Sequence, residues 1–207
     1  MKQPQLLVDV VTQHQQTNSL SLTPSTSLTR QEQKKQLAIV ERFGDRDAFL
    51  NTVTPKTQAA FAAKPMQAFM GDYPTITGIR IAYGGKFPEQ WLYPQIADLA
   101  LFTGAANINK EQMRSLASVI ATEYHYLKVT EILIFFHRFK AGHYGRFYGS
   151  VDPMVITCAL REFIKDRNIF IEQYERELQN AKREREQMKL QPTVTREEYE
   201  AMKSKKQ

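Results

Sequence analysis

The sequence predicts an all-α protein, with a compact helical domain followed by a charged helix that protrudes from it. Three observations predict this class. Apolar residues recur at intervals of three and four along most of the chain, several of these segments start at capping residues and end at glycine, and only one short segment alternates as a strand does. With 207 residues, 42% of them hydrophobic, the chain has enough apolar material for one sizeable core.

The composition divides the chain into three parts. Residues 1–28 are rich in Gln, Ser and Thr, with one short apolar patch, Leu6–Val11. A segment of this kind lacks the apolar surface that would offset the entropy of ordering it. We therefore predict a disordered tail over 1–28, a helical domain over 29–178, and a charged C-terminal helix and tail over 179–207.

The first predicted helices are marked by local signals. Thr29 and Glu32 have the spacing of a capping box, and Gly44 is placed to end the helix that they start. A short helix is expected to follow before Val53. Pro65 should split or kink the alanine-rich segment that comes next.

Residues 75–85 carry the one strand signal. Ile76, Gly78, Ile79 and Ile81 give a partial alternation, which Gly84 and Gly85 end. The segment is short and has no evident partner strand, and an isolated strand pair is only marginally stable. The sequence therefore leaves open one short β-hairpin or an extended segment near 75–85.

Three helices are expected between Pro88 and Gly142. The first ends at Gly104, and the second covers 110–127 with Asn109 as its cap. The third, 131–141, contains the apolar run ILIFF, which is more typical of a central core helix than of a DNA recognition helix.

Asp152 followed by Pro153 is a strong start signal for the last long helix. The apolar positions predict that one side of it is buried as far as Leu178. Those positions are Ile156, Leu160, Phe163, Ile164, Ile171, Tyr174 and Leu178. Beyond Leu178 the helix is charged on all sides, so it should project into solvent or against a partner.

The sequence predicts no catalytic residue, metal site or cofactor. Gly142, Gly145 and Gly149 lack the spacing of a phosphate-binding loop. His137 and His143 are six residues apart, whereas two ligands on one helical face need a spacing of four. Cys158 is interpreted as a small buried apolar residue rather than a nucleophile. The expectation is a protein that is not an enzyme.

The composition also predicts where the protein resides. The single cysteine fits a reducing compartment, and the longest apolar run is far too short to span a bilayer. We therefore expect a cytoplasmic protein without a membrane partner. The net charge of +6 favours acidic partners, such as nucleic acid, without proving one.

The densest candidate site is the basic–aromatic turn, which we define as the stretch around residues 138–148. No acidic residue lies between Glu131 and Asp152. Cations there could neutralise phosphates, and the rings could stack on bases or fill a partner's pocket. The candidate residues are Arg138, Lys140, His143, Tyr144, Arg146, Phe147 and Tyr148. The alternative is that these aromatic residues only pack at a helix corner, while Arg138 and Lys140 are solvated.

The run from Tyr124 to Pro153 resembles an uncharacterised protein family encoded by phages and integrated mobile elements of gut bacteria. FGDRDA, at 43–48, and QIADLALFTG, at 95–104, belong to the same resemblance, which covers roughly residues 30–178. The helical pattern is also faintly similar to small phage helicase-loader and replisome-organiser proteins. That likeness supplies no functional residues.

Two functions are expected from these observations. The first is a nucleic-acid-associated accessory protein of a phage or mobile element, in replication initiation or helicase loading. Its partners would be DNA, held through phosphate contacts, and a helicase or other protein. The alternative is a protein–protein adaptor or a structural or assembly protein of a phage, with no direct nucleic-acid binding. The sequence leaves the oligomeric state open, as well as the choice between DNA and RNA.

Overall fold

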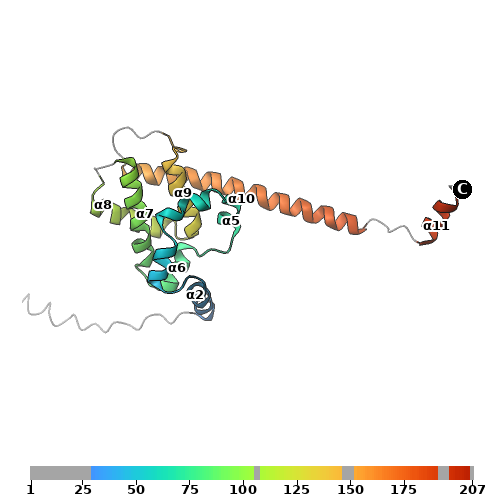
Figure 1. Ribbon diagram of the computed structural model, residues 1–207, viewed down its shortest axis with the longest axis horizontal. Coiled ribbons are helices and arrows are strands. Elements are labelled where there is room, and N and C mark those ends of the chain that lie inside the picture. The colour runs from blue at the N-terminus through green and yellow to red at the C-terminus, as the bar shows by residue number, and fades with distance from the viewer. Residues whose placement is uncertain (1–28, 105–107, 146–151, 191–195, 206–207) are drawn as a thin grey trace, which may run out of the picture.

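Helices make up the regular structure of the computed structural model, which describes residues 29–104, 108–145, 152–190 and 196–205 (Figure 1). The α-helices are α2 (Arg30–Phe43), α3 (Arg46–Thr52), α4 (Gln58–Ala62), α5 (Pro65–Met70), α6 (Ile76–Tyr83), α7 (Phe87–Thr103), α8 (Lys110–Glu123), α9 (Val129–Lys140), α10 (Pro153–Leu190) and α11 (Arg196–Ser204). One 3-10 helix, η1 (Pro55–Thr57), precedes α4. No strand occurs in these residues, so the predicted all-α class is confirmed. The predicted tail, 1–28, lies outside them.

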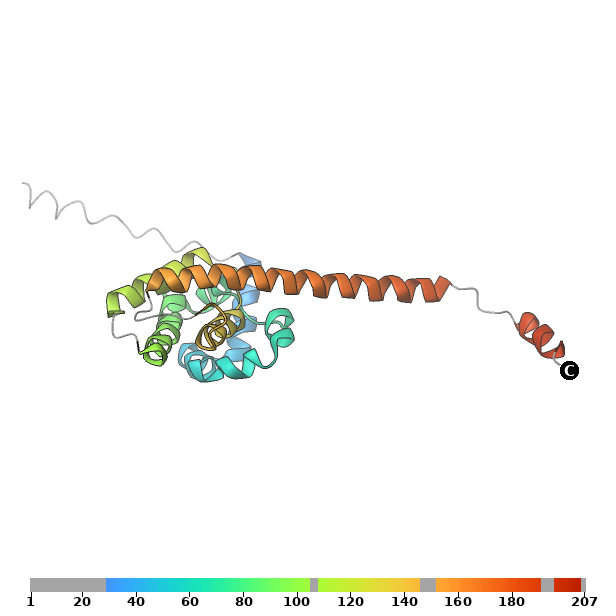
Figure 2. The ribbon, with the colours of Figure 1, turned by 90° about the horizontal axis from the view of Figure 1, so that it is seen from above.

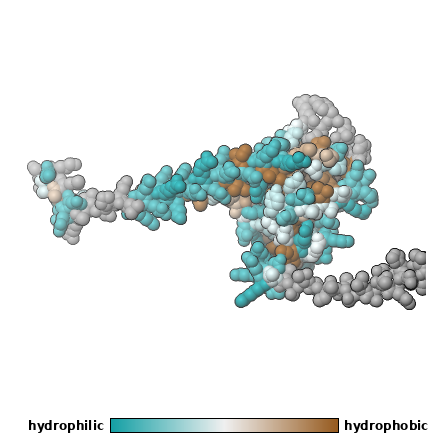
Figure 3. Space-filling model, turned by 180° about the vertical axis from the view of Figure 1, so that it is seen from behind, coloured by the Kyte–Doolittle hydropathy of each residue, from teal (hydrophilic) through white to brown (hydrophobic). Residues whose placement is uncertain are grey.

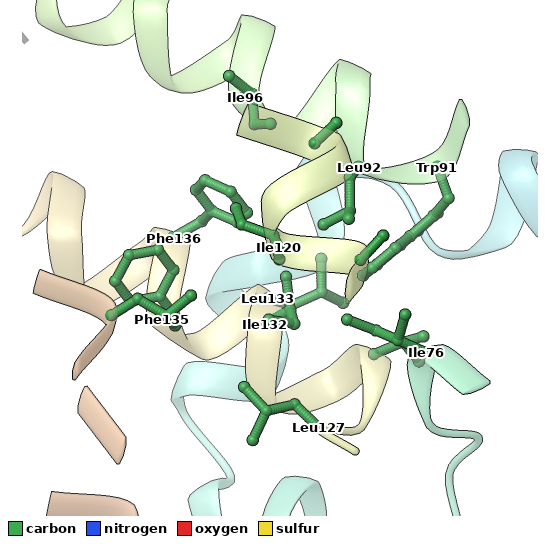
Figure 4. Close-up of a cluster of buried hydrophobic side chains, with 14 of the residues drawn as sticks. Ile76, Trp91, Leu92, Ile96, Ile120, Leu127, Ile132, Leu133, Phe135 and Phe136 are labelled. Carbon is green, nitrogen blue, oxygen red and sulfur yellow. The ribbon is translucent and has the colours of Figure 1, made fainter. Parts of the chain in front are cut away.

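Helix α9 lies at the centre of the core. Its first eight residues, Val129 to Phe136, are all buried, as expected for a core helix rather than a recognition helix. Figure 4 shows Leu133 and Phe136 of α9 among side chains of α7 and α8, which include Leu92 and Ile120. Helix α9 also packs against α4 and α5, which lie far earlier in the chain, so it joins neighbouring and distant helices in one core.

The expected strand or extended segment at 75–85 is wrong, because residues 76–83 form helix α6. Thr75 caps this helix through its side chain, which accepts a 3.0 Å bond from the N–H of Gly78. The N–H groups of Ile76 and Thr77 donate to backbone carbonyls of residues 127 and 125. The first N–H groups of α6 have no acceptor within their own helix. They therefore donate to the loop between α8 and α9.

A polar cluster at the start of α9 fastens two other helices, α5 and α10, to it. Thr130 donates to the carbonyl of Ala68 at 2.7 Å, and the ammonium of Lys128 donates to the carbonyls of Phe69 and Gly71 at 2.7 Å each. These carbonyls lie at the C-terminal end of α5, where helical partners are lacking. The α9 side chains therefore satisfy the end of α5.

Glu131 extends this cluster to α10. Its side chain is fully buried and accepts from the backbone N–H of Lys128 at 2.8 Å and from Arg167 Nε at 2.7 Å. A buried carboxylate needs such partners, because unpaired burial of its charge is very unfavourable. We call the side chains of Lys128, Thr130, Glu131 and Arg167 the α9 latch.

Helices α2 to α9 form the compact part of the molecule, which we call the body. Helix α10 covers one side of this body and then continues well beyond it (Figures 1 and 2). Ile156, Leu160 and Phe163 are buried, and the contact with the body reaches Phe170, whose ring centroid lies 5.0 Å from that of Phe69. The predicted buried side was too long. Leu178 is 58% exposed, because the body ends before this residue.

Most of the local start and stop signals are confirmed. The capping boxes at Thr29 and Asn109 are both formed, Pro65 separates α4 from α5, and Gly104 ends α7 in the left-handed conformation. Among the described helices, none is both long enough and apolar enough to cross a membrane.

The α9 latch predicts a specific loss of stability. Thr130→Val removes a buried hydroxyl and leaves the carbonyl of Ala68 without its donor, so the free energy of unfolding should fall by about 1–3 kcal/mol. Denaturant unfolding followed by circular dichroism measures this change. Thr52→Val is the matched control, because Thr52 is exposed and bonds only within its own helix. Equal stability of the two variants would contradict this role of Thr130.

Candidate nucleic-acid interface

The structure describes four of the seven residues predicted in the basic–aromatic turn. Arg138 and Lys140 lie in the last turn of α9, and His143 and Tyr144 follow it. Gly142 and Gly145 adopt positive φ angles of 79° and 97°, which L-residues rarely adopt. The remaining three predicted residues, Arg146, Phe147 and Tyr148, lie outside the described residues.

Tyr144 packs against the core. Its ring centroid lies 5.8 Å from that of Phe135 and 6.3 Å from that of Phe139, and its hydroxyl is buried with no hydrogen-bond partner within 3.5 Å among the described residues. Burial raises the pKa of Tyr144 to about 12, although the nearby Arg138 guanidinium acts in the opposite direction. This ring therefore contributes to packing at the helix corner.

Two of the predicted cations are engaged within the body. The Arg138 guanidinium lies 6.0 Å from the ring centroid of Phe69 and 5.9 Å from that of Phe163, within reach of a cation–π interaction. Lys140 forms a 2.7 Å ion pair with Asp98, and its side chain is only 18% exposed. Both charges thus have partners in the protein before any phosphate approaches.

His143 is the exposed member of the four, and the described part of the turn therefore presents little free positive charge. Tyr144 thus packs at the helix corner, whereas Arg138 and Lys140 are half-buried and engaged within the protein rather than solvated. The binding role of the turn as a whole stays a prediction, since three of its seven candidate residues lie outside the described residues.

A second basic and aromatic surface is formed by segments nearer the N-terminus, residues 31–43 and 72–78. A groove of about 480 Å³ runs between α2 and residues 72–78, and we call it the α2 groove. Its cations are Lys34, Lys35 and Arg42, and its aromatic side chains are Phe43 and Tyr73. Most of the surface inside it is apolar.

Arg42 is fixed between the two rings. Its guanidinium carbon lies 4.8 Å from the ring centroid of Tyr73 and 5.1 Å from that of Phe43, and Nη1 donates to the backbone carbonyl of Asp72. Lys34 and Lys35 are exposed, and neither forms an ion pair with another described residue. The groove therefore combines one ordered cation with two free ones beside aromatic faces.

Helix α2 packs against α6 through specific contacts. The Tyr83 hydroxyl donates to the carbonyl of Gly44 at 3.0 Å, and a Cβ on Gly78 would come within 3.3 Å of Ile39. No residue of α2 is fully buried, so the helix lies on the surface and leaves space along its edge. The glycine permits the close approach that shapes the groove floor.

Only part of this groove has a signal in the sequence. Lys34, Lys35 and Arg42 recur at intervals of seven and eight, which places them on one side of a helix. Tyr73 lies about thirty residues further along the chain, and only the packing of α2 beside residues 72–78 brings it to them.

The described residues contain no group of three or more His, Cys, Asp or Glu side chains that could hold a metal ion. The expectation that Cys158 is buried is wrong, because this cysteine is exposed. The buried positions Ile156 and Leu160 lie on one face of α10, and position 158 is about 200° from the first of them, on the opposite face. Proximity in sequence to core residues was therefore misleading.

Comparison with known proteins adds one similarity. Residues 108–207 match a family of unknown function (DUF6633). The match includes α8, α9, α10 and α11 and begins after the α2 groove. No curated protein and no solved structure matches the chain.

The environment of Tyr144 predicts the effect of removing its hydroxyl. Tyr144→Phe should leave stability unchanged or raise it by about 1 kcal/mol at neutral pH, because the buried hydroxyl has no partner to lose. The pKa of Tyr144 is raised in the folded state. Its contribution to the free energy of unfolding is therefore complete below pH 10 and is lost as the pH rises towards 12.

Thermal unfolding at pH 7 and between pH 10 and 12 measures both effects. The melting temperature of the natural chain should fall more steeply than that of Tyr144→Phe across the alkaline range. Parallel curves, or a Tyr144→Phe variant that is clearly less stable at neutral pH, would show that the hydroxyl has a favourable partner.

Proposed function

We propose that this chain associates with nucleic acid and that the α2 groove is the contact surface. The observation that carries the proposal is that the exposed Lys34 and Lys35 line one groove with the rings of Tyr73 and Phe43, between which the Arg42 guanidinium lies. Proteins that bind single strands combine cations, which follow the phosphates, with aromatic faces, on which bases stack. The α2 groove offers both on one open surface.

Single-stranded nucleic acid suits this surface better than a duplex. The rings lie inside a groove, where they can meet an unpaired base but not the edge of a paired one. The carboxylate of Asp72 also lines the groove and opposes phosphate at one end, so the phosphates should follow the side of Lys34 and Lys35.

Replacing both free lysines provides the main test. The double variant Lys34→Ala and Lys35→Ala should bind a labelled oligonucleotide more weakly at low salt, as measured by fluorescence anisotropy. Each phosphate contact on a single strand adds about 0.7 to the slope of log affinity against log salt, so the slope should fall by about 1.4. Alanine favours helix, so α2 should persist.

The matched control makes the same change of charge elsewhere. Lys56 and Lys64 are exposed and lie outside the groove, so replacing both by alanine should change the salt slope little. Equal losses in the two double variants would indicate binding by net charge alone. No binding by the natural chain at low salt would refute the proposal.

The aromatic component needs a separate variant. Tyr73→Leu keeps an apolar side chain but removes the stacking face, so affinity for a single strand should fall by about 1–3 kcal/mol. The salt slope should not change, since no phosphate contact is lost. A weaker affinity with an altered slope would mean that the substitution acts by displacing Arg42.

A role as a protein–protein adaptor is the second candidate, and the length of α10 favours it. All residues from Glu175 to Lys189 are exposed, and a helix charged around most of its surface is suited to contact another chain. We also propose, from the resemblance of Tyr124–Pro153, that the gene belongs to a phage or mobile element. Neighbouring replication genes would support the nucleic-acid role, and neighbouring capsid or tail genes the adaptor role.

A further inference from the structure

The stripe of α10 that faces the body continues beyond the body on the same face of the helix. The body-facing residues are Ile156, Leu160, Phe163, Arg167 and Phe170, at intervals of four and three. The same alternation then runs through Ile171, Tyr174, Leu178, Ala181, Arg185 and Met188, which we call the α10 seam. Sustained spacing of three and four is the pattern of a helix that packs along another helix.

Most of the α10 seam is uncovered. Leu178 is 58% exposed and Met188 is 72% exposed, and every residue from Glu175 to Lys189 is classed as exposed. The projecting half is largely hydrophilic in Figure 3, so these side chains are exceptions on a charged rod. Most of the stability of a helix in a protein comes from packing of its apolar side, so a covering partner would stabilise the projecting half of α10.

We propose that a second copy of this chain covers the α10 seam, with the two α10 helices antiparallel. The two-fold axis passes between Gln179 and Asn180. The layers that result are Ile171 with the partner's Met188, Tyr174 with the partner's Arg185, and Leu178 with the partner's Ala181, each formed twice. The proposal does not depend on the α2 groove, so the two can fail separately.

The shape of the molecule excludes the parallel arrangement. The body lies on the side of α10 that the seam continues (Figure 2). Two packed helices are only about 8–10 Å apart, so in a parallel pair both bodies would have to occupy the same space between the helices. In the antiparallel pair the bodies lie at opposite ends, and each projecting half meets only its counterpart.

The side chains are complementary in this register. Tyr174 offers an aromatic face to the guanidinium of the partner's Arg185, a favourable cation–π pair. Large Leu178 meets the small side chain of the partner's Ala181. At the flank, Glu175 lies beside the partner's Lys182 with opposite charge.

One contact in this register is unfavourable. Glu177 approaches the partner's Glu184, and two carboxylates repel. The partner's Arg185 lies next to this pair and offsets part of the repulsion. A seam with arginine and alanine among its six positions should give a weak dimer that dissociates on dilution.

The first test measures the mass of the full chain by sedimentation equilibrium over a range of concentrations. The mass should rise from 23.9 kDa towards twice that value. Leu178→Asp places a charge in the seam and should weaken association at least about tenfold, whereas Arg185→Leu should strengthen it. Gln179→Asp adds the same charge on the same helix but off the seam, and should retain most of the association.

Circular dichroism separates loss of association from loss of fold, since Leu178 is exposed and its replacement should leave the helical content of the monomer unchanged. A chain that is monomeric at every concentration, together with a monomeric Arg185→Leu, would overturn the proposal. The seam would then be left to a different protein. Equal weakening by Leu178→Asp and Gln179→Asp would overturn it as well.

The second test determines the orientation. With Cys158 replaced by serine, a spin label is attached to a cysteine at position 179 or at position 187. In the antiparallel pair, labels at 179 should be level with each other, and labels at 187 should be about 22 Å apart along the axis. Parallel helices would bring both pairs of labels level, and equally short distances at 179 and 187 would refute the arrangement.

Discussion

The buried carboxylate of Glu131 is the interaction on which the arrangement of the helices depends. It accepts from the backbone of Lys128 and from Arg167, so one side chain caps α9 and holds α10 against it. Its neighbours Lys128 and Thr130 satisfy the carbonyls at the end of α5. A charge so fully removed from water is tolerated only when its bonds are complete, so the cluster admits few alternative packings.

The same short segment also positions α6. An antiparallel bridge joins Thr75 to Lys128, and the first N–H groups of α6 donate to the carbonyls of residues 125 and 127. Four consecutive residues, 128–131, therefore contact α5, α6 and α10 while α9 itself enters the core. The polar side chains at the start of the Tyr124–Pro153 run therefore have a structural role that requires no ligand.

Local signals predicted the helix ends well, because a capping residue and its target lie within one turn of each other, as at Thr29 and Asn109. Isoleucine and threonine favour strands, so the pattern of residues 76–83 left a strand or an extended segment open, although Thr75 is a residue that caps the helix found there. The α2 groove and the ion pair of Lys140 with Asp98 depend on packing between distant segments. Side-chain pairs of that kind leave no periodic signal in one sequence.

The two arginines on the body-facing stripe of α10 show how a partner can complete this surface. Arg167 occupies a stripe position that a core would ordinarily give to an apolar residue, and the body accommodates it with the carboxylate of Glu131. Arg185 occupies an equivalent position eighteen residues later, where the protein has no body to receive it. An antiparallel second copy supplies the partner's Tyr174 face and the partner's Glu177 carboxylate at that point. The stripe therefore makes physical sense along its whole length only when both of its arginines have a counterpart.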